Sequence, residues 1–251
     1  MENEFKSIMI DVINFSKYVK PIMDGFRNWY IENKVIIQSI IEAGYELSNW
    51  ARAIDLMKNN QFVFTDDLTL EFAIEVIDSS DVNETVEKYY FGNNEMRMTN
   101  LIERIMNYKQ MKDYKELFSQ VVFSYNSNHY LLASLGAFTI IDGIMSLLSE
   151  DITSTNFRKR MNLIKEKLNK NVELSQMDKL LFCIISCIDT VSSSFFDRYD
   201  FDNIEKDTID RNWITHGRTK RIYTKCDFLK IILFLDAIII LDNYKTALCE
   251  V

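Results

Sequence analysis

The chain contains very little proline and glycine, with one proline and six glycines in 251 residues. Sheet-rich folds need turn residues at short intervals, so this scarcity argues against them and favours long, uninterrupted helices. Apolar residues recur with helical periodicity along nearly the whole sequence. We therefore predict an all-α fold, a helical bundle, for which the 47% hydrophobic residues provide ample core material.

Histidine and cysteine are also scarce, with two histidines and four cysteines. The cysteines have neither the spacing of a zinc knuckle nor that of a redox motif, and the acidic residues form no recognisable metal cluster. The sequence also lacks a glycine-rich nucleotide-binding loop and the Gly-x-Ser-x-Gly elbow of many serine hydrolases. We therefore expect no metal and no cofactor.

The net charge is −8, which is unusual for a protein that coats nucleic acid, because phosphate contacts dominate that affinity. Any action on RNA must therefore use a local basic patch. Arg218, Lys220, Arg221 and Lys225 form one and are candidates for RNA binding. The alternative is that this run is only a solvated loop after a helix.

No targeting or membrane segment is evident in the sequence. The first residues include acids where a secretory signal has bases, so we expect a cytoplasmic protein. The most apolar stretch, Phe228 to Leu241, is shorter than the about 20 residues that a membrane span needs, and it contains Lys230 and Asp236. We predict that it is a buried core helix and that the protein does not enter a membrane.

Local patterns predict the order of the helices and where they end. The polar run at residues 124–128 is the clearest break, and Gly92 begins a Gly-Asn-Asn stop signal. Helix starts are expected at Asp66 or Asp67, at Ser154 or Thr155, and at Ser175. The periodic segments predict helices over residues 35–57, 70–78, 84–91, 101–106, 114–123, 129–148, 157–168, 176–196 and 226–246.

The break at residue 124 is the predicted boundary between two parts. Residues 1–124 would form a helical extension of unknown role, and residues 125–251 a compact helical unit. The break is too short to act as a linker, so we expect the two parts to pack on each other.

Residues 211–217, Arg-Asn-Trp-Ile-Thr-His-Gly, contain the groups that metal-free RNA cleavage needs. RNA supplies its own nucleophile, the 2′-OH, so a catalyst has to move protons and offset charge on the phosphate. Histidine exchanges protons near neutral pH, and arginine holds a fixed charge that can bind two phosphate oxygens. If the segment is helical, Asn212 and His216 share one face, and Gly217 ends the helix. Arg211 lies off that face, so it should sit at the helix start or reach in from the loop.

Structural alternatives exist for each of these residues. His216 could be a surface histidine at a helix C-terminus, where its charge complements the helix dipole. Arg211 could simply pair with Asp207 or Asp210. Trp213 and Ile214 are expected in the core. His129 is expected at a helix start, and Tyr223 could stack on a base.

Two stretches resemble the HEPN superfamily of small helical domains. Residues 211–217 have the form Arg-Asn, three residues, then His-Gly, which is frequent in C-terminal HEPN domains of bacterial anti-phage and toxin proteins. Residues 129–143 resemble the helix of such domains in which a tyrosine precedes an apolar run that ends in an acid and a glycine. The acid here is Asp142, where glutamate is commoner. The resemblance covers residues 125–251, and residues 1–124 resemble nothing specific.

The resemblance implies a domain that dimerises through residues 125–251 and brings two signatures together at the interface. It also implies metal-independent endoribonuclease activity, with Arg211, Asn212 and His216 as catalytic residues. Many such proteins are toxins or abortive-infection effectors, so RNA (tRNA or mRNA), a second copy and an antitoxin or sensor are the expected partners. The alternative is a non-catalytic interaction or dimerisation module of a defence or regulatory complex.

Overall fold

A computed structural model of the chain describes residue 46 and residues 48–65, 69–154, 156–171, 179–196 and 205–249. The chain divides into two compact units, Met1–Asn49 and Trp50–Val251, and the fold described below is that of the second. The described residues form helices and no strand, which confirms the predicted all-α class. The part of the predicted helix 35–57 that precedes residue 46, and the predicted cap at Ser175, lie outside the described residues.

The helices follow one another in the predicted order. Residues 48–59 are helical and precede the labelled elements. Within α3, residues 92–95 depart from helical dihedral angles, which confirms the predicted stop at Gly92. The elements are α2 (Leu70–Asp78), α3 (Val82–Asn107), the 3-10 helix η1 (Lys109–Tyr114), α4 (Lys115–Asn126), α5 (Tyr130–Ser149), α6 (Phe157–Asn171), α7 (Lys179–Phe195), α8 (Arg211–Thr215) and α9 (Lys225–Cys249).

Three local predictions need correction. Thr69 caps α2, rather than the aspartates at 66–67, because its hydroxyl accepts from a backbone N–H at 3.3 Å. Asn156 caps α6 in place of the predicted residues 154–155, since its side-chain oxygen accepts from the N–H three residues later at 3.1 Å. The break predicted at residues 124–128 is shorter than expected, because α4 continues through Asn126. In the first two cases a neighbouring polar side chain satisfies the exposed backbone groups instead.

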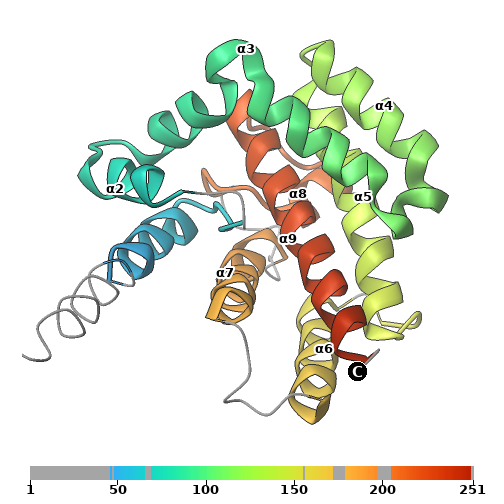
Figure 1. Cartoon of the computed structure of the whole chain (residues 1–251). Coiled ribbons are helices and arrows are strands. Elements are labelled where there is room, and N and C mark those ends of the chain that lie inside the picture. Colours follow the sequence, from blue (N-terminus) through green and yellow to red (C-terminus); the bar gives the residue numbers. More distant parts are fainter. Residues whose placement is uncertain are drawn as a thin grey trace, which may run out of the picture. The chain divides into compact units, whose positions relative to one another are not determined.

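Helix α9 is the centre of the fold (Figure 1), and α3, α5, α6 and α7 all pack on it. The stretch from Phe228 to Leu241 is buried at every position except Lys230, which confirms the predicted core helix. A helix that is apolar on all sides has no solvent-facing side and therefore fits a central position. Residues from both sides of residue 124 contribute to the single apolar cluster around α9. The predicted domain boundary itself stays a prediction.

Five phenylalanines join α9 to three of these neighbours. Phe138 lies on α5, Phe157 on α6, Phe195 at the end of α7 with Phe196 directly after it, and Phe234 on α9. Phe157 stacks on Phe196 with ring centroids 4.2 Å apart, and Phe195 approaches Phe234 at 5.2 Å. Aromatic pairs of this kind contribute beyond the area that they bury, so the cluster fixes how the helices pack.

By length and composition, α5 could also cross a membrane, and in the described part of the chain no other helix passes that test. Half of its most apolar window is buried inside the protein. Central helices of globular proteins satisfy the same two criteria, so composition alone does not assign α5 to a membrane.

Three carboxylates on α9 are buried, and each is bonded to another segment. Arg104 of α3 forms a two-point ion pair with Asp236, one contact being an Nε–Oδ1 hydrogen bond of 2.9 Å. Asp242 accepts from the Tyr108 hydroxyl, and burial together with this bond raises the pKa of Tyr108 well above its usual range. Asp227 binds the loop that precedes α9. A buried charge without such partners would strongly destabilise the fold.

Helices α4 and α5 are in close contact at Gly136. A Cβ atom at this position would lie 2.5 Å from the Val121 Cγ2 atom of α4, closer than real side chains come. We expect Gly136→Ala to lower the free energy of unfolding by about 1–3 kcal/mol, measured by urea denaturation, because the helices must separate.

Gly92→Ala is the matched control, since a Cβ atom there would meet nothing within 4 Å. If both variants lose the same free energy of unfolding, Gly136 does not set the spacing of α4 and α5.

Candidate functional site

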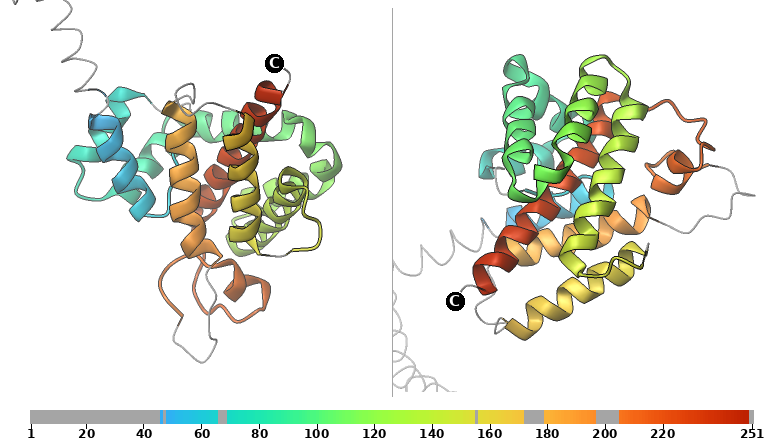
Figure 2. Two further views of the ribbon diagram at one scale, coloured as in Figure 1. Left: turned by 90° about the horizontal axis from the view of Figure 1, so that it is seen from below. Right: turned by 90° about the vertical axis from the view of Figure 1, so that its right-hand side faces the viewer.

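The predicted signature forms α8, which lies with its flanking loops at the margin of the helical core (Figure 2). Asp210 starts the helix, because its side chain accepts from the Asn212 N–H at 2.7 Å. The backbone N–H of His216 bonds to the Asn212 carbonyl at 3.1 Å, and Gly217 follows with φ of +64°. This confirms the short helix and the left-handed glycine stop, a conformation that favours residues without a Cβ.

Arg211 is the first residue of α8, which is one of the two positions predicted for it, and its guanidinium pairs with the Asp142 carboxylate of α5. The same group donates from Nη1 to the Asn212 side-chain oxygen at 3.3 Å. The two stretches that resemble the HEPN superfamily therefore meet in space. The sequence suggested Asp207 or Asp210 as the partner of Arg211, and the structure shows Asp142 instead. Asp207 pairs with Arg221, and Asp210 caps α8.

The ion pair and the histidine are both reached by solvent. About a quarter of the side-chain surface of Arg211 and of Asp142 is exposed (24% and 25%), and His216 is exposed at the C-terminal end of α8. Trp213 and Ile214 are buried, which confirms their predicted core position. The polar side of α8 thus presents an arginine, an amide and an imidazole, while its apolar side anchors it.

Arg160 of α6 is a second arginine at this site and was not among the residues predicted for it. Its Nη1 donates to the backbone carbonyl oxygen of Asp142 at 3.1 Å, and the residue is only 5% exposed. A signal was present, because Arg160 falls on the apolar stripe formed by Phe157, Met161 and Ile164 at helical spacing. A charged residue on a buried stripe indicates a specific role.

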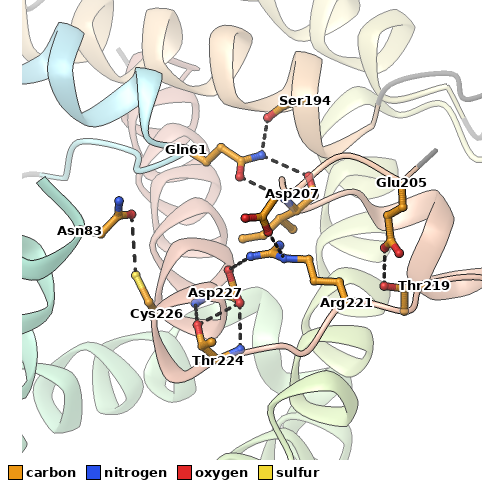
Figure 3. Close-up of polar contacts among 11 residues, drawn as sticks. Gln61, Asn83, Ser194, Glu205, Asp207, Thr219, Arg221, Thr224, Cys226 and Asp227 are labelled. Carbon is orange, nitrogen blue, oxygen red and sulfur yellow. Dashed lines mark hydrogen bonds and ion pairs between the residues drawn. The ribbon is translucent and has the colours of Figure 1, made fainter. Parts of the chain in front are cut away.

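The four residues of the predicted basic patch differ in their exposure to solvent. Arg218 and Lys220 are exposed. Arg221 instead pairs with Asp227 at 2.6 Å and with Asp207 at 3.2 Å, as Figure 3 shows.

Lys225, the fourth member of the patch, pairs with Glu95 and lies 4.2 Å from the centre of the Phe91 ring. The hydrogen bond from Lys225 lowers the pKa of Glu95. Burial disfavours the charged form of Arg221, but Asp227 outweighs this and raises its pKa. Arg221 and Lys225 therefore hold the loop in place through their carboxylate partners, and the other two residues of the patch face solvent.

The two remaining candidates, Tyr223 and His129, occupy positions that fit a structural role. Tyr223 is buried, and burial raises the pKa of its hydroxyl above the usual range. Its ring does not face solvent, so the base-stacking role considered for it gains no support. His129 is exposed directly before α5, which confirms the predicted helix-start position.

The loop between α8 and α9 is held at both ends (Figure 3). Glu205 accepts from the Thr219 hydroxyl and, at 2.7 Å, from the Lys220 N–H. At the other end, the Thr224 hydroxyl accepts from the Asp227 N–H at 3.2 Å, and the Asp227 carboxylate accepts from the Thr224 N–H at 2.8 Å. This reciprocal arrangement is a capping box, which starts α9 at a defined residue.

Gln61 fixes the backbone just before the signature, and no sequence pattern indicated it. Its Oε1 accepts from the Ile209 N–H at 3.0 Å, while its Nε2 donates to the Ile209 carbonyl at 3.1 Å and to the Ser194 hydroxyl at 2.8 Å (Figure 3). The side chain therefore satisfies both backbone groups of a buried residue. Ile209 lies two residues before Arg211, so Gln61 positions the start of α8.

Within the residues that the structure describes, no group of three His, Cys, Asp or Glu side chains converges to hold a metal ion. Comparisons of the chain with protein-family models, with curated proteins and with solved structures give no match. The resemblance to the HEPN superfamily therefore depends on residues 129–143 and 211–217 alone.

Proposed function

We propose that the protein is a metal-independent endoribonuclease of the HEPN type. One observation supports this most: Arg211 of the signature contacts Asp142 of the second resembling stretch, and His216 is exposed on the same short helix. Arg211 would bind the scissile phosphate and His216 would act as general acid or base. Asn212, which accepts a hydrogen bond from Arg211, would orient the arginine.

The proposed reaction starts from the 2′-OH of the RNA. A histidine removes the proton, the oxygen attacks the adjacent phosphorus, and a proton goes to the leaving 5′-oxygen, which gives a 2′,3′-cyclic phosphate and a 5′-OH. Two copies of His216 across a homodimer would supply the base and the acid together. Arg211 would exchange its Asp142 partner for the phosphate. Arg218 and Lys220 are exposed and would bind the flanking backbone.

The cellular role is proposed from the resemblance. The protein would be an anti-phage abortive-infection effector or a toxin in the bacterial cytoplasm, acting on tRNA or mRNA and controlled by an antitoxin or a sensor. Arg221 is paired with Asp207 and Asp227, and Lys225 is paired with Glu95. Each would bind RNA only after leaving these carboxylates.

The test is incubation of the purified protein with total RNA and with a tRNA pool in excess EDTA, followed by denaturing gels and analysis of the product ends. We expect cleavage that EDTA does not reduce, with products ending in 2′,3′-cyclic phosphate. Products ending in 3′-OH, formed only with a divalent metal, would contradict the proposal.

A second candidate function is a non-catalytic interaction module. Three large apolar side chains are exposed beside the turn between α4 and α5, namely Phe123 (71%), Leu131 (39%) and Leu132 (58%). Exposed apolar groups of this size often mark protein interfaces. A protein that binds a partner through this surface, and that shows no cleavage of RNA with or without the partner, would favour the module over the nuclease.

A further inference from the structure

Arg160 is a buried cation that no carboxylate neutralises among the residues described. It is 5% exposed, and its guanidinium makes one hydrogen bond there, to the Asp142 carbonyl oxygen at 3.1 Å. Its Nε has no partner in that part of the chain. Burying a charge without a counter-charge is costly, and an apolar side chain of similar size would fill the same space at lower cost. Packing alone therefore does not explain an arginine here.

The position of Arg160 suggests what the missing partner is. Arg160 and Arg211 contact the same residue, one at its carbonyl oxygen and the other at its carboxylate. The two guanidinium groups therefore lie within about 10 Å of each other. Together with Asp142 they carry two positive charges and one negative charge. One more anion would balance the charge of the set, and the Arg211–Asp142 pair beside Arg160 is partly exposed.

We propose that Arg160 is a second phosphate-binding residue, which works with Arg211 to hold one phosphate group of the RNA backbone. The anion would accept hydrogen bonds from the guanidinium of Arg160, and charge-assisted bonds of this kind are among the strongest in proteins. The choice of RNA rests on the proposed function. Binding of the phosphate group itself does not require catalysis, so the two can be tested apart.

The first experiment measures thermal unfolding of the full chain in inorganic phosphate, against chloride at matched ionic strength. Phosphate should raise the Tm of the wild type in a saturable way, because it binds the folded state. Arg160→Met keeps the length of the side chain but removes the charge. It should lose the phosphate response while its Tm in chloride equals or exceeds that of the wild type, since an unneutralised buried charge is gone.

Two further variants test whether loss of the phosphate response is specific to the charge at position 160 or follows from any change in α6. Arg158→Met removes an exposed arginine two residues earlier on the same helix and should respond to phosphate as the wild type does. Arg160→Lys keeps a charge without the planar fork and should retain part of the response. A phosphate response that survives in Arg160→Met, or no response in the wild type, would overturn the proposal.

RNA cleavage provides the second readout. Arg160→Met should raise the KM or lower the kcat/KM for RNA by about tenfold or more, which is the effect of losing one charge-assisted contact. Equal cleavage by Arg160→Met and the wild type would reject Arg160 while leaving the nuclease proposal intact. A wild type that binds phosphate through Arg160 but cleaves no RNA would reject the nuclease and keep the anion site.

Discussion

His216→Ala is expected to lower the rate of RNA cleavage by about 10²–10⁴-fold, because it removes the group that transfers protons in the proposed reaction. The side chain is exposed at the end of α8 and lies outside the core. The free energy of unfolding should therefore change by less than about 1 kcal/mol. Initial cleavage rates on a defined RNA, measured beside urea denaturation of the same samples, check both parts.

The chain offers a matched control, since its only other histidine is His129, which is also exposed and precedes α5. His129→Ala should cleave RNA at the wild-type rate. Arg211→Lys would keep the charge but lose the two-point geometry for phosphate, so its rate should fall between those of the wild type and Arg211→Ala. If His216→Ala cleaves as fast as His129→Ala, the catalytic assignment is wrong.

Arg104→Met is expected to lower the free energy of unfolding by about 3–5 kcal/mol, the largest effect on stability that we predict. Its partner Asp236 lies on the central helix and is fully buried, with 0% of its side chain exposed. Removing the arginine leaves a fully buried carboxylate without the counter-charge that Arg104 supplies. Urea denaturation at pH 7 measures the loss directly.

Substituting the other partner, Asp236, should lower the free energy of unfolding by less. The side chain of Arg104 is 36% exposed and can turn toward solvent when the carboxylate is lost. Asp236→Asn should therefore cost less than Arg104→Met. The double variant Arg104→Met/Asp236→Leu removes both charges and should recover most of the loss. Arg97→Met, at an exposed position of the same helix, is the control and should cost less than about 1 kcal/mol. A loss in Arg104→Met no larger than in this control would contradict the argument.

Local patterns in the sequence predicted the features that depend on neighbouring residues. The all-helical class, the buried stretch from Phe228 to Leu241, the position of Arg211 at a helix start and the stop at Gly217 are all confirmed. Each follows from helical periodicity or from the conformational freedom of one residue, and both are visible in a short window of sequence.

Contacts between distant segments could not be predicted in this way. Arg211 pairs with an acid 69 residues earlier, and Gln61 bonds to a backbone 148 residues later. Both depend on how the helices pack, which periodicity does not specify. For the same reason, the sequence showed four basic residues after the signature but not that Arg221 and Lys225 are bonded to acids of the protein.

The bonds of Gln61 restrict what natural variation can place at that position. A side chain that serves both the N–H and the carbonyl of Ile209 must carry a donor and an acceptor, which glutamate and leucine do not, and asparagine is one methylene shorter. Variants of this protein that retain Arg211 and His216 should therefore retain glutamine at position 61. In sequences that have lost Arg211 and His216 this constraint no longer applies, so we expect other residues at position 61 in them.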